Sequence, residues 1–285
     1  MKAAAFDYVR ARSVTEAVKL LARHAGEARL LAGGQSLLPA LNLRLSAPAL
    51  LVDIGRIPGL RGVTAAGGVL RIGATTTYAD LAASPEVALH APMLPRAIAD
   101  VAHPAIRSRG TIGGSLANAD PAAELPACAL ALGARMLAQG PGGQRTIPAE
   151  AFFTGLFETA LAPDEMLVAI EIDAAPGAQW GFAELARRSG DYAIVGLAAQ
   201  ATAAGAPRLG YFAVGARAVL ARNAAAALAG GVTPATLAQA SDALAQDLEP
   251  PADLQATSAT RMALARVLLR RVVGPWAGLA QARAA

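Results

Sequence analysis

Adjacent glycines occur twice in this 285-residue sequence, beside side chains that can donate hydrogen bonds. The first pair, Gly33 and Gly34, follows a short apolar run and precedes Gln35 and Ser36. Because glycine has no Cβ atom, its backbone can lie directly against a ligand, and successive N–H groups in such a turn form a concave site for an anion. A single pair of this kind is more often an ordinary tight turn, so this motif alone does not predict a site.

The second pair, Gly113 and Gly114, lies between the hydroxyl residues Thr111 and Ser115. Two such loops about 80 positions apart indicate one ligand held from two sides. A diphosphate fits this arrangement, because it has oxygens on both faces and needs many N–H donors. Neither loop has the G-x-G-x-x-G spacing or the lysine of a phosphate loop, so a dinucleotide here would be held by a fold other than the Rossmann fold.

Polar residues follow the second pair at the start of a predicted helix. Asp120 and Pro121 suit the N-cap and the first turn of a helix over residues 120–132. Glu124 then falls in the first turn, where the helix dipole favours a carboxylate. A carboxylate at this position can accept hydrogen bonds from ribose hydroxyls or an amino group, and Asn118 lies just before it.

The elements that must position these loops can be read from periodicity and turn residues. Ser13 and Glu16 have capping-box spacing at the start of a helix. The remaining patterns predict strands at 28–31, 50–54 and 167–172, strand–turn–strand units at 63–74 and 135–147, and a short helix at 95–102. After Pro176 they predict strands near 182–187, 194–201 and 208–214, then helices at 218–229, 234–244 and 259–273. The sequence therefore predicts a mixed α+β part to about residue 175, followed by an antiparallel sheet with helices.

Composition and charge limit the function classes. The net charge is +4 and the pI about 9.7, but only 4% of residues are aromatic, so a nucleic-acid-binding face is not expected. No run of about 18 apolar residues predicts a membrane span, and the first ten residues lack the apolar stretch of a signal peptide. A cytoplasmic location is therefore the default expectation.

The remaining reactive residue types favour structural roles. Cys128 is the single cysteine, which excludes an internal disulfide and any cysteine-ligated metal or iron–sulfur cluster within this chain. It lies in an apolar stretch and is expected to be a buried small hydrophobe. His103 precedes Pro104 and is expected to pack or hydrogen-bond rather than catalyse. The sequence shows no Ser–His–Asp pattern, so no catalytic residue is predicted in this chain.

The two glycine motifs, together with Asp120, Pro121 and Glu124, closely resemble those of the FAD-binding medium subunit of molybdenum hydroxylases. This family includes the flavoprotein subunit of aerobic carbon monoxide dehydrogenase and equivalents in quinoline, nicotine and xanthine dehydrogenases. Further resemblances run along nearly the whole chain, at residues 6–8, 51–54, 72–74, 103–107, 152–155 and 188–193.

The resemblance implies an α+β fold in two domains. A PCMH-type (vanillyl-alcohol-oxidase-like) FAD-binding domain would span residues 1–175, with subdomains at about 1–55 and 56–175. A smaller C-terminal flavoprotein domain, with an antiparallel sheet and helices, would span residues 176–285.

The resemblance also implies a set of FAD-binding residues. The first loop would hold the pyrophosphate, and the second would close over it and the ribityl chain. Glu124 would lie near the adenosine end, and residues 184–192 would approach the isoalloxazine ring from the second domain. The implied set is Ala32, Gly33, Gly34, Gln35, Ser36, Leu37, Ala102, Thr111, Ile112, Gly113, Gly114, Ser115, Asn118, Asp120, Glu124, Leu161, Met166, Leu167, Glu184, Asp191 and Tyr192.

The chain departs from the family pattern at three points. Some relatives have a lysine near Glu184, and this chain has none there. Gln35 stands where the carbon monoxide enzyme has histidine. With Cys128 alone, the chain lacks the cysteines with which some relatives hold an extra [4Fe–4S] cluster.

The function that the resemblance implies is electron transfer within a complex. A large subunit with the molybdenum cofactor would oxidise the substrate, and a small subunit with two [2Fe–2S] clusters would pass electrons to FAD in this chain. The FAD would reduce an external acceptor, and the complex is expected to be a dimer of heterotrimers. Two alternatives stay open: a xanthine-dehydrogenase-type subunit that reduces NAD at the flavin, and a flavin-free assembly module.

Overall fold

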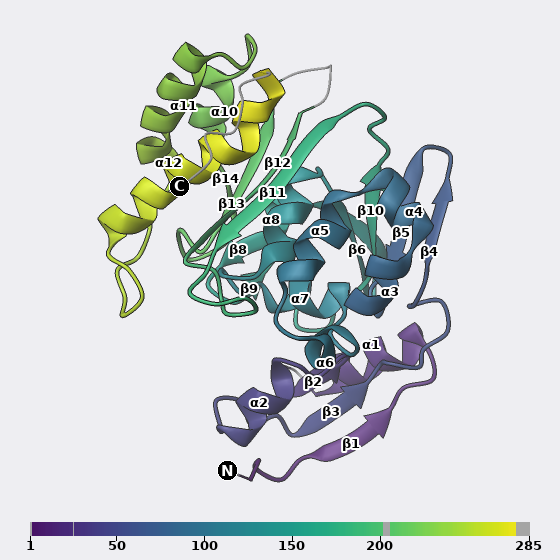
Figure 1. Cartoon of the computed structure of the whole chain (residues 1–285). Coiled ribbons are helices and arrows are strands. Elements are labelled where there is room, and N and C mark those ends of the chain that lie inside the picture. The colour runs from purple at the N-terminus through teal and green to yellow at the C-terminus, as the bar shows by residue number, and fades with distance from the viewer. Residues whose placement is uncertain (1, 25, 202–205, 278–285) are drawn as a thin grey trace.

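The computed structural model describes residues 2–24, 26–201 and 206–277, and these form three main sheets in chain order (Figure 1). The N-terminal lobe has a parallel sheet of order β1-β3-β2. Parallel neighbours need crossover connections, and two helices supply them. The elements are β1 (Asp7–Arg10), α1 (Val14–Arg23), β2 (Ala28–Leu31), α2 (Leu37–Asn42) and β3 (Leu50–Asp53).

Side-chain caps define where α1 begins. The Ser13 hydroxyl accepts a hydrogen bond from the Glu16 N–H at 3.1 Å, and the Glu16 carboxylate accepts one from the Arg12 N–H at 2.7 Å. This arrangement satisfies backbone donors that the first turn leaves free. The apolar face of α1, with Ala17, Val18 and Leu21, is buried in the core of the lobe.

The second sheet is antiparallel, with order β4-β5-β10-β6-β7. Its strands are β4 (Val63–Ala66), β5 (Val69–Gly73), β6 (Arg135–Gly140), β7 (Gly143–Pro148) and β10 (Met166–Asp173). The central strand β10 is buried on both faces, as its nearly continuous apolar sequence requires. Six helices connect β5 to β6: α3 (Tyr78–Ala83), α4 (Pro85–His90), α5 (Met93–Asp100), α6 (Pro104–Arg107), α7 (Ile112–Asn118) and α8 (Glu124–Ala131).

The C-terminal part is an antiparallel sheet of order β11-β12-β13-β14 with helices on its outer face (Figure 1). The strands are β11 (Gln179–Leu185), β12 (Val195–Ala201), β13 (Arg208–Phe212) and β14 (Val219–Leu220). The helices are α10 (Arg222–Ala227), α11 (Pro234–Asp247) and α12 (Ser258–Val273), followed by a 3-10 turn at Gly274–Ala277. A short helix, α9 (Ala149–Phe152), and the two-stranded sheet of β8 (Phe153–Gly155) and β9 (Glu158–Thr159) precede β10.

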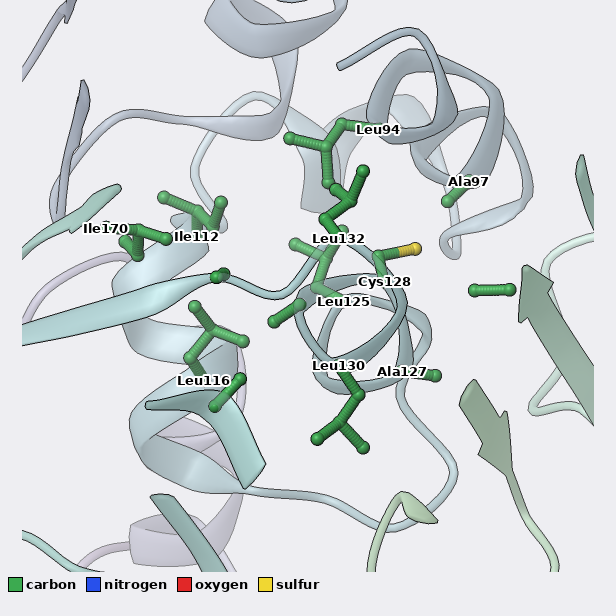
Figure 2. Packing of buried hydrophobic residues seen from close by; sticks show 14 of the residues in the cluster. Leu94, Ala97, Ile112, Leu116, Leu125, Ala127, Cys128, Leu130, Leu132 and Ile170 are labelled. Carbon is green, nitrogen blue, oxygen red and sulfur yellow. The ribbon is translucent and has the colours of Figure 1, made fainter. Parts of the chain in front are cut away.

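The helices α5 and α8 join the second and third sheets into one core. Figure 2 shows α8 at the centre of this cluster, with Ile112 and Leu116 on one side and Leu94 and Ala97 on another. Strand β13 approaches α8 so closely that a Cβ on Gly210 would lie 2.4 Å from the Ala127 carbonyl oxygen. None of the described helices is long and apolar enough to cross a bilayer.

The mixed α+β fold class is confirmed, and two expected helix starts are wrong. The helix expected from Asp120 begins at Glu124, because Asp120 forms a separate turn in which its carboxylate accepts from the Ala122 N–H at 2.9 Å. The Pro121 carbonyl is also taken, by the Ala213 N–H at 2.8 Å. The helix expected from residue 218 begins at Arg222, because residues 219–220 pair with β13 as β14.

Candidate cofactor-binding site

The structure brings the two glycine motifs into contact. Gly33 lies so close to the second motif that a Cβ there would be 2.2 Å from the Arg109 carbonyl oxygen. A Cβ on Gly114 would lie 4.0 Å from the Cβ of Ala32. Residues about 80 positions apart in the sequence therefore share one surface, as expected for two sides of one site.

The first motif presents free backbone donors. Within the described part of the chain, the N–H groups of Gly33, Gly34, Gln35 and Ser36 have no backbone or side-chain acceptor. The residues are half-buried except for exposed Ser36, and Gly34 has a left-handed φ of +73°. Donors that are open to solvent can bond to water or to a ligand, and four successive N–H groups in a turn can accommodate an anionic group. One of the two N–H groups of the Gln35 side-chain amide donates to the Gly33 carbonyl at 3.0 Å, which leaves the second N–H of that amide as a further donor.

The second glycine pair is helical, which corrects the expectation of a loop. Thr111 is the N-cap of α7, and its hydroxyl accepts from the Gly114 N–H at 3.2 Å. The Gly113 N–H donates to the Ala74 carbonyl at 2.9 Å, and the Ser115 N–H to the Thr111 carbonyl at 3.0 Å. These donors are therefore occupied, and the second pair contributes a surface without side chains rather than an anion nest.

The glycine at position 113 is required by packing. A Cβ there would lie 2.5 Å from the Ala74 carbonyl oxygen, at the end of β5. The adjacent Ile112 N–H donates to the Thr76 carbonyl at 3.0 Å, so α7 is anchored directly on the second sheet. Gly113 thus allows α7 to pack closely on the second sheet. Gly114 leaves the surface of α7 that faces Ala32 without a side chain.

A group of half-buried titratable residues continues from α7. Tyr78 lies near the Ser115 hydroxyl, and burial raises the pKa of the Tyr78 phenol to about 12. Burial raises the pKa of Glu124 to about 7, and the charges of Asp120 and Asp100 act in the same direction. Glu124 is therefore divided between its acid and its carboxylate near neutral pH.

A cleft of about 420 Å³ opens between the two domains at Asp120 and Tyr192. Tyr192 is 63% exposed and lies near Asp120, so the loop after β11 reaches the residues that follow α7. Phe157, from the turn between β8 and β9, and Arg261 of α12 also line the cleft. Arg261 is only 4% exposed, and its guanidinium donates to the Ala213 carbonyl and the Asp253 carboxylate.

The loop after β11 also contacts the segment before α6. Gly190 has a φ of +84°, and a Cβ there would lie 2.8 Å from the Ala102 carbonyl oxygen and 2.9 Å from the His103 ring. Ala102 is itself left-handed, with a φ of +39°. The Arg107 guanidinium donates to the carbonyls of Val101 and Ala102 at 2.9 and 3.2 Å, which holds this conformation. Asp191, beside this contact, is exposed.

The other residues of the expected set differ in their exposure and position. Met166 and Leu167 are 0% and 4% exposed in the cores on the two faces of β10, so they offer almost no surface to a ligand in this conformation. Leu161 is half-buried and packs against the main core. Leu37 begins α2, and Asn118 ends α7. Glu184 lies in β11, which packs against α5.

Two contributors to the site did not stand out in the sequence. The backbone carbonyl of Arg109 lies against Gly33, and Tyr78 lies near Ser115. Neither residue has a sequence signature. Arg107 was part of a segment that resembles the family, but its role as a donor to three carbonyls depends on the turn at Ala102.

The fold and this site define a flavoprotein class. Residues 4–174 match the family described as the FAD binding domain in molybdopterin dehydrogenase, and residues 180–275 match the CO dehydrogenase flavoprotein C-terminal domain. The glycines, free donors and two-domain arrangement described above lie within these matches.

Individual relatives agree with this class. The chain is 47% identical to the 6-hydroxypseudooxynicotine dehydrogenase complex subunit alpha of Paenarthrobacter nicotinovorans, over 71% of this chain and 69% of that protein. It is 36% identical to the carbon monoxide dehydrogenase medium chain of Afipia carboxidovorans, over 94% and 95% of the two chains. A solved structure of carbon monoxide dehydrogenase from Hydrogenophaga pseudoflava superposes with a TM-score of 0.93 at 38% identity, covering 98% of this chain and 99% of that one.

The chain belongs to the FAD-binding medium subunits of the carbon monoxide dehydrogenase and xanthine dehydrogenase family of molybdenum hydroxylases. It is thus an oxidoreductase flavoprotein component, as the resemblance of the glycine motifs implied. The domain boundaries at residues 55 and 175, and the individual FAD contacts, stay predictions.

Proposed function

We propose that this chain holds FAD between its two domains, takes electrons from [2Fe–2S] clusters of a small partner subunit, and passes them to an external acceptor. A large partner subunit with the molybdenum cofactor would oxidise the substrate, in a dimer of heterotrimers. The observation that carries the proposal is the row of free N–H donors at residues 33–36, packed against the second glycine motif.

The residues present fit the cofactor. The FAD diphosphate is an anion with several acceptor oxygens, and the first motif offers four free donors from consecutive residues. Gly114 leaves the facing surface open. A Cβ on Gly114 would have the Ala32 Cβ, at 4.0 Å, as its nearest atom from another segment. The interdomain cleft at Asp120 and Tyr192 lies beyond the end of α7 and is the proposed place for the ring end.

Each part of the chain would then have a separate task. Residues 33–36 hold the diphosphate and thereby fix the position of the whole cofactor. The loop at Gly190 and Tyr192 limits water at the cleft, because it closes against Ala102 and Asp120. Bound flavin supplies one- and two-electron chemistry, and the surrounding charges of this chain set how readily it accepts electrons.

The substrate would be selected by another chain. Relatives with similar sequences are subunits of enzymes named for different molecules, such as 6-hydroxypseudooxynicotine, carbon monoxide and caffeine. We infer that this medium subunit is a shared electron-transfer module and that the large subunit confers specificity. The cytoplasmic location also stays a prediction.

Rapid mixing of the purified complex with its reducing substrate tests the electron path. The expected result is bleaching of the iron–sulfur bands, followed or accompanied by bleaching of the flavin band. Clusters that are reduced while flavin stays oxidised would contradict the proposal. Addition of NAD to the reduced complex then tests the alternative acceptor: rapid reoxidation of the flavin with formation of NADH would support the xanthine-dehydrogenase-type function instead.

A further inference from the structure

The interface between α5, α8 and β11 contains more carboxylates than cations. Glu184 of β11 lies near Glu124 of α8 and near Asp100 and Arg96 of α5. Helix α5 packs against both α8 and β11, so it links the elements that carry Glu124 and Glu184 at the junction of the two domains. Among the described residues, Arg96 is the cation whose charge acts on Glu184.

The Arg96 guanidinium already interacts with two other side chains. The Arg96 guanidinium donates to the Asp100 carboxylate at 2.7 Å and lies 5.7 Å from the centre of the Phe182 ring. Glu184 has no comparable partner: its Oε2 atom is buried and makes no hydrogen bond within the described part of the chain. A buried carboxylate oxygen without a donor is costly when ionised, so this geometry favours the protonated acid.

The other groups around the pair do not offset this charge. Asp120 precedes Glu124, and Tyr192 and Tyr78 lie near Glu124. Cys128, one helical turn after Glu124, is fully buried, and its thiol pKa is raised by burial and by both glutamates. Burial, and then the charge of Glu124, raises the pKa of Glu184 to about 8, and burial raises that of Glu124 to about 7.

We propose that Glu184 and Glu124 hold one proton between them at neutral pH, and that this proton keeps the domain interface able to accept the negative charge of reduced FAD. The idea rests on the proposed function, since it requires the cofactor to lie beside these residues. Two ionised carboxylates would repel electrons arriving at the cofactor, whereas a shared proton removes one of the two charges. Glu184 thus acts on the cofactor through its charge and is a positioning residue.

Unfolding of the full chain in urea tests the shared proton without any cofactor. A folded pKa above the unfolded value gives stability that is present at low pH and is lost as pH rises through the folded pKa. Between about pH 5.5 and pH 9, the unfolding midpoint of Glu184→Gln should therefore rise relative to wild type. Glu124→Gln should change in the same direction, and Glu249→Gln, at an exposed position, should not. A midpoint difference that is independent of pH for either variant would overturn the proposal.

Redox titration of the bound FAD tests the link to the cofactor. The midpoint potential of wild type should fall more steeply with pH above about 7.5 than that of Glu184→Gln, because wild type has two carboxyl groups to ionise and the variant has only Glu124. Equal slopes would overturn the link. If wild type binds no FAD, the proposed function fails together with this link, whereas the urea comparison still decides whether the proton is shared.

Discussion

Gly34 sets the shape of the first glycine motif. Its φ of +73° is a conformation that side-chain-bearing residues rarely adopt, and a Cβ there would lie 3.1 Å from Leu38 and 3.2 Å from Leu31. The direction of the free N–H groups at residues 33–36 depends on this turn. Gly33 is a less informative position, because a side chain there would collide with the Arg109 backbone and disturb the fold itself.

Replacing Gly34 should therefore weaken cofactor binding in a specific way. Left-handed strain of roughly 1–2 kcal/mol in Gly34→Ala predicts about a tenfold loss of FAD affinity. Gly68→Ala is a matched control, since Gly68 has a similar φ of +79° and open space around it in the β4–β5 turn. Titration of FAD fluorescence against both variants measures the effect. Equal affinities in the two variants would show that the Gly34 turn does not hold the cofactor.

The sequence could identify the glycines but not their separate roles. Both pairs look alike in the sequence, because each is flanked by hydroxyl or amide residues. The donors of the second pair are occupied by the carbonyl of Ala74 and by Thr111, and a bond to Ala74 depends on the packing of α7 against β5. Such long-range hydrogen bonds have no local sequence signal, so the asymmetry between the two motifs appears only in the fold.

At the scale of elements, the loop between β11 and β12 joins the two domains. Gly190 packs against Ala102 and His103, and Tyr192 lies near Asp120 in the cleft. The loop thus closes over the segment from α5 to α8, which carries the second glycine motif. Sequence periodicity predicted the flanking strands well, but the start of α8 was displaced because the Pro121 carbonyl pairs with Ala213 in another element.

Enlarging Gly190 should release this loop. In Gly190→Ala, the added methyl group would lie 2.8 Å from the Ala102 carbonyl, so the loop must move away. Trypsin should then cleave after the exposed Arg187 or Arg188 roughly tenfold faster, if docking loses about 1.4 kcal/mol. Gly177→Ala is the matched control, with a φ of +74° and no atom near the added group. Cleavage at equal rates in the two variants would show that the Gly190 contact does not hold the loop.

At the scale of the whole molecule, ion pairs outside the site help to hold the C-terminal sheet on the FAD-binding domain. Glu150 of α9 accepts hydrogen bonds from Arg208 of β13 and from Arg222 of α10, and Arg208 also donates to the Leu130 carbonyl at 2.9 Å. Burial opposes the ionised form of Glu150, but the two guanidinium groups prevail and lower its pKa. The network fixes the relative position of the two sides of the cleft.

Glu150→Gln should destabilise the chain in a pH-dependent manner. A carboxyl group with a lowered folded pKa contributes stability above its unfolded pKa, and this contribution is lost as pH falls through the folded pKa. We expect a loss of about 1 kcal/mol near neutral pH, because the pairs are partly exposed, and a much smaller loss near pH 3. Urea unfolding at both pH values measures it, with Glu249→Gln as the exposed control. An equal loss at both pH values would show that the charge of Glu150 is not the cause.

The architecture as a whole was largely predictable, because strand alternation and the two glycine motifs are local signals. Two features were not predictable from the sequence: the burial of Met166, and the proximity of the Glu124 and Glu184 carboxyl groups. Both result from how distant elements pack on β10 and α8.

The central claim is that this chain itself holds FAD at the first glycine motif. Equilibrium dialysis of the purified, folded chain against FAD, with Gly34→Ala and Gly68→Ala in parallel, tests it most directly. The account predicts a single FAD bound by wild type and by Gly68→Ala, with clearly weaker binding by Gly34→Ala. A folded wild-type chain that retains no FAD, or three proteins with the same affinity, would contradict it.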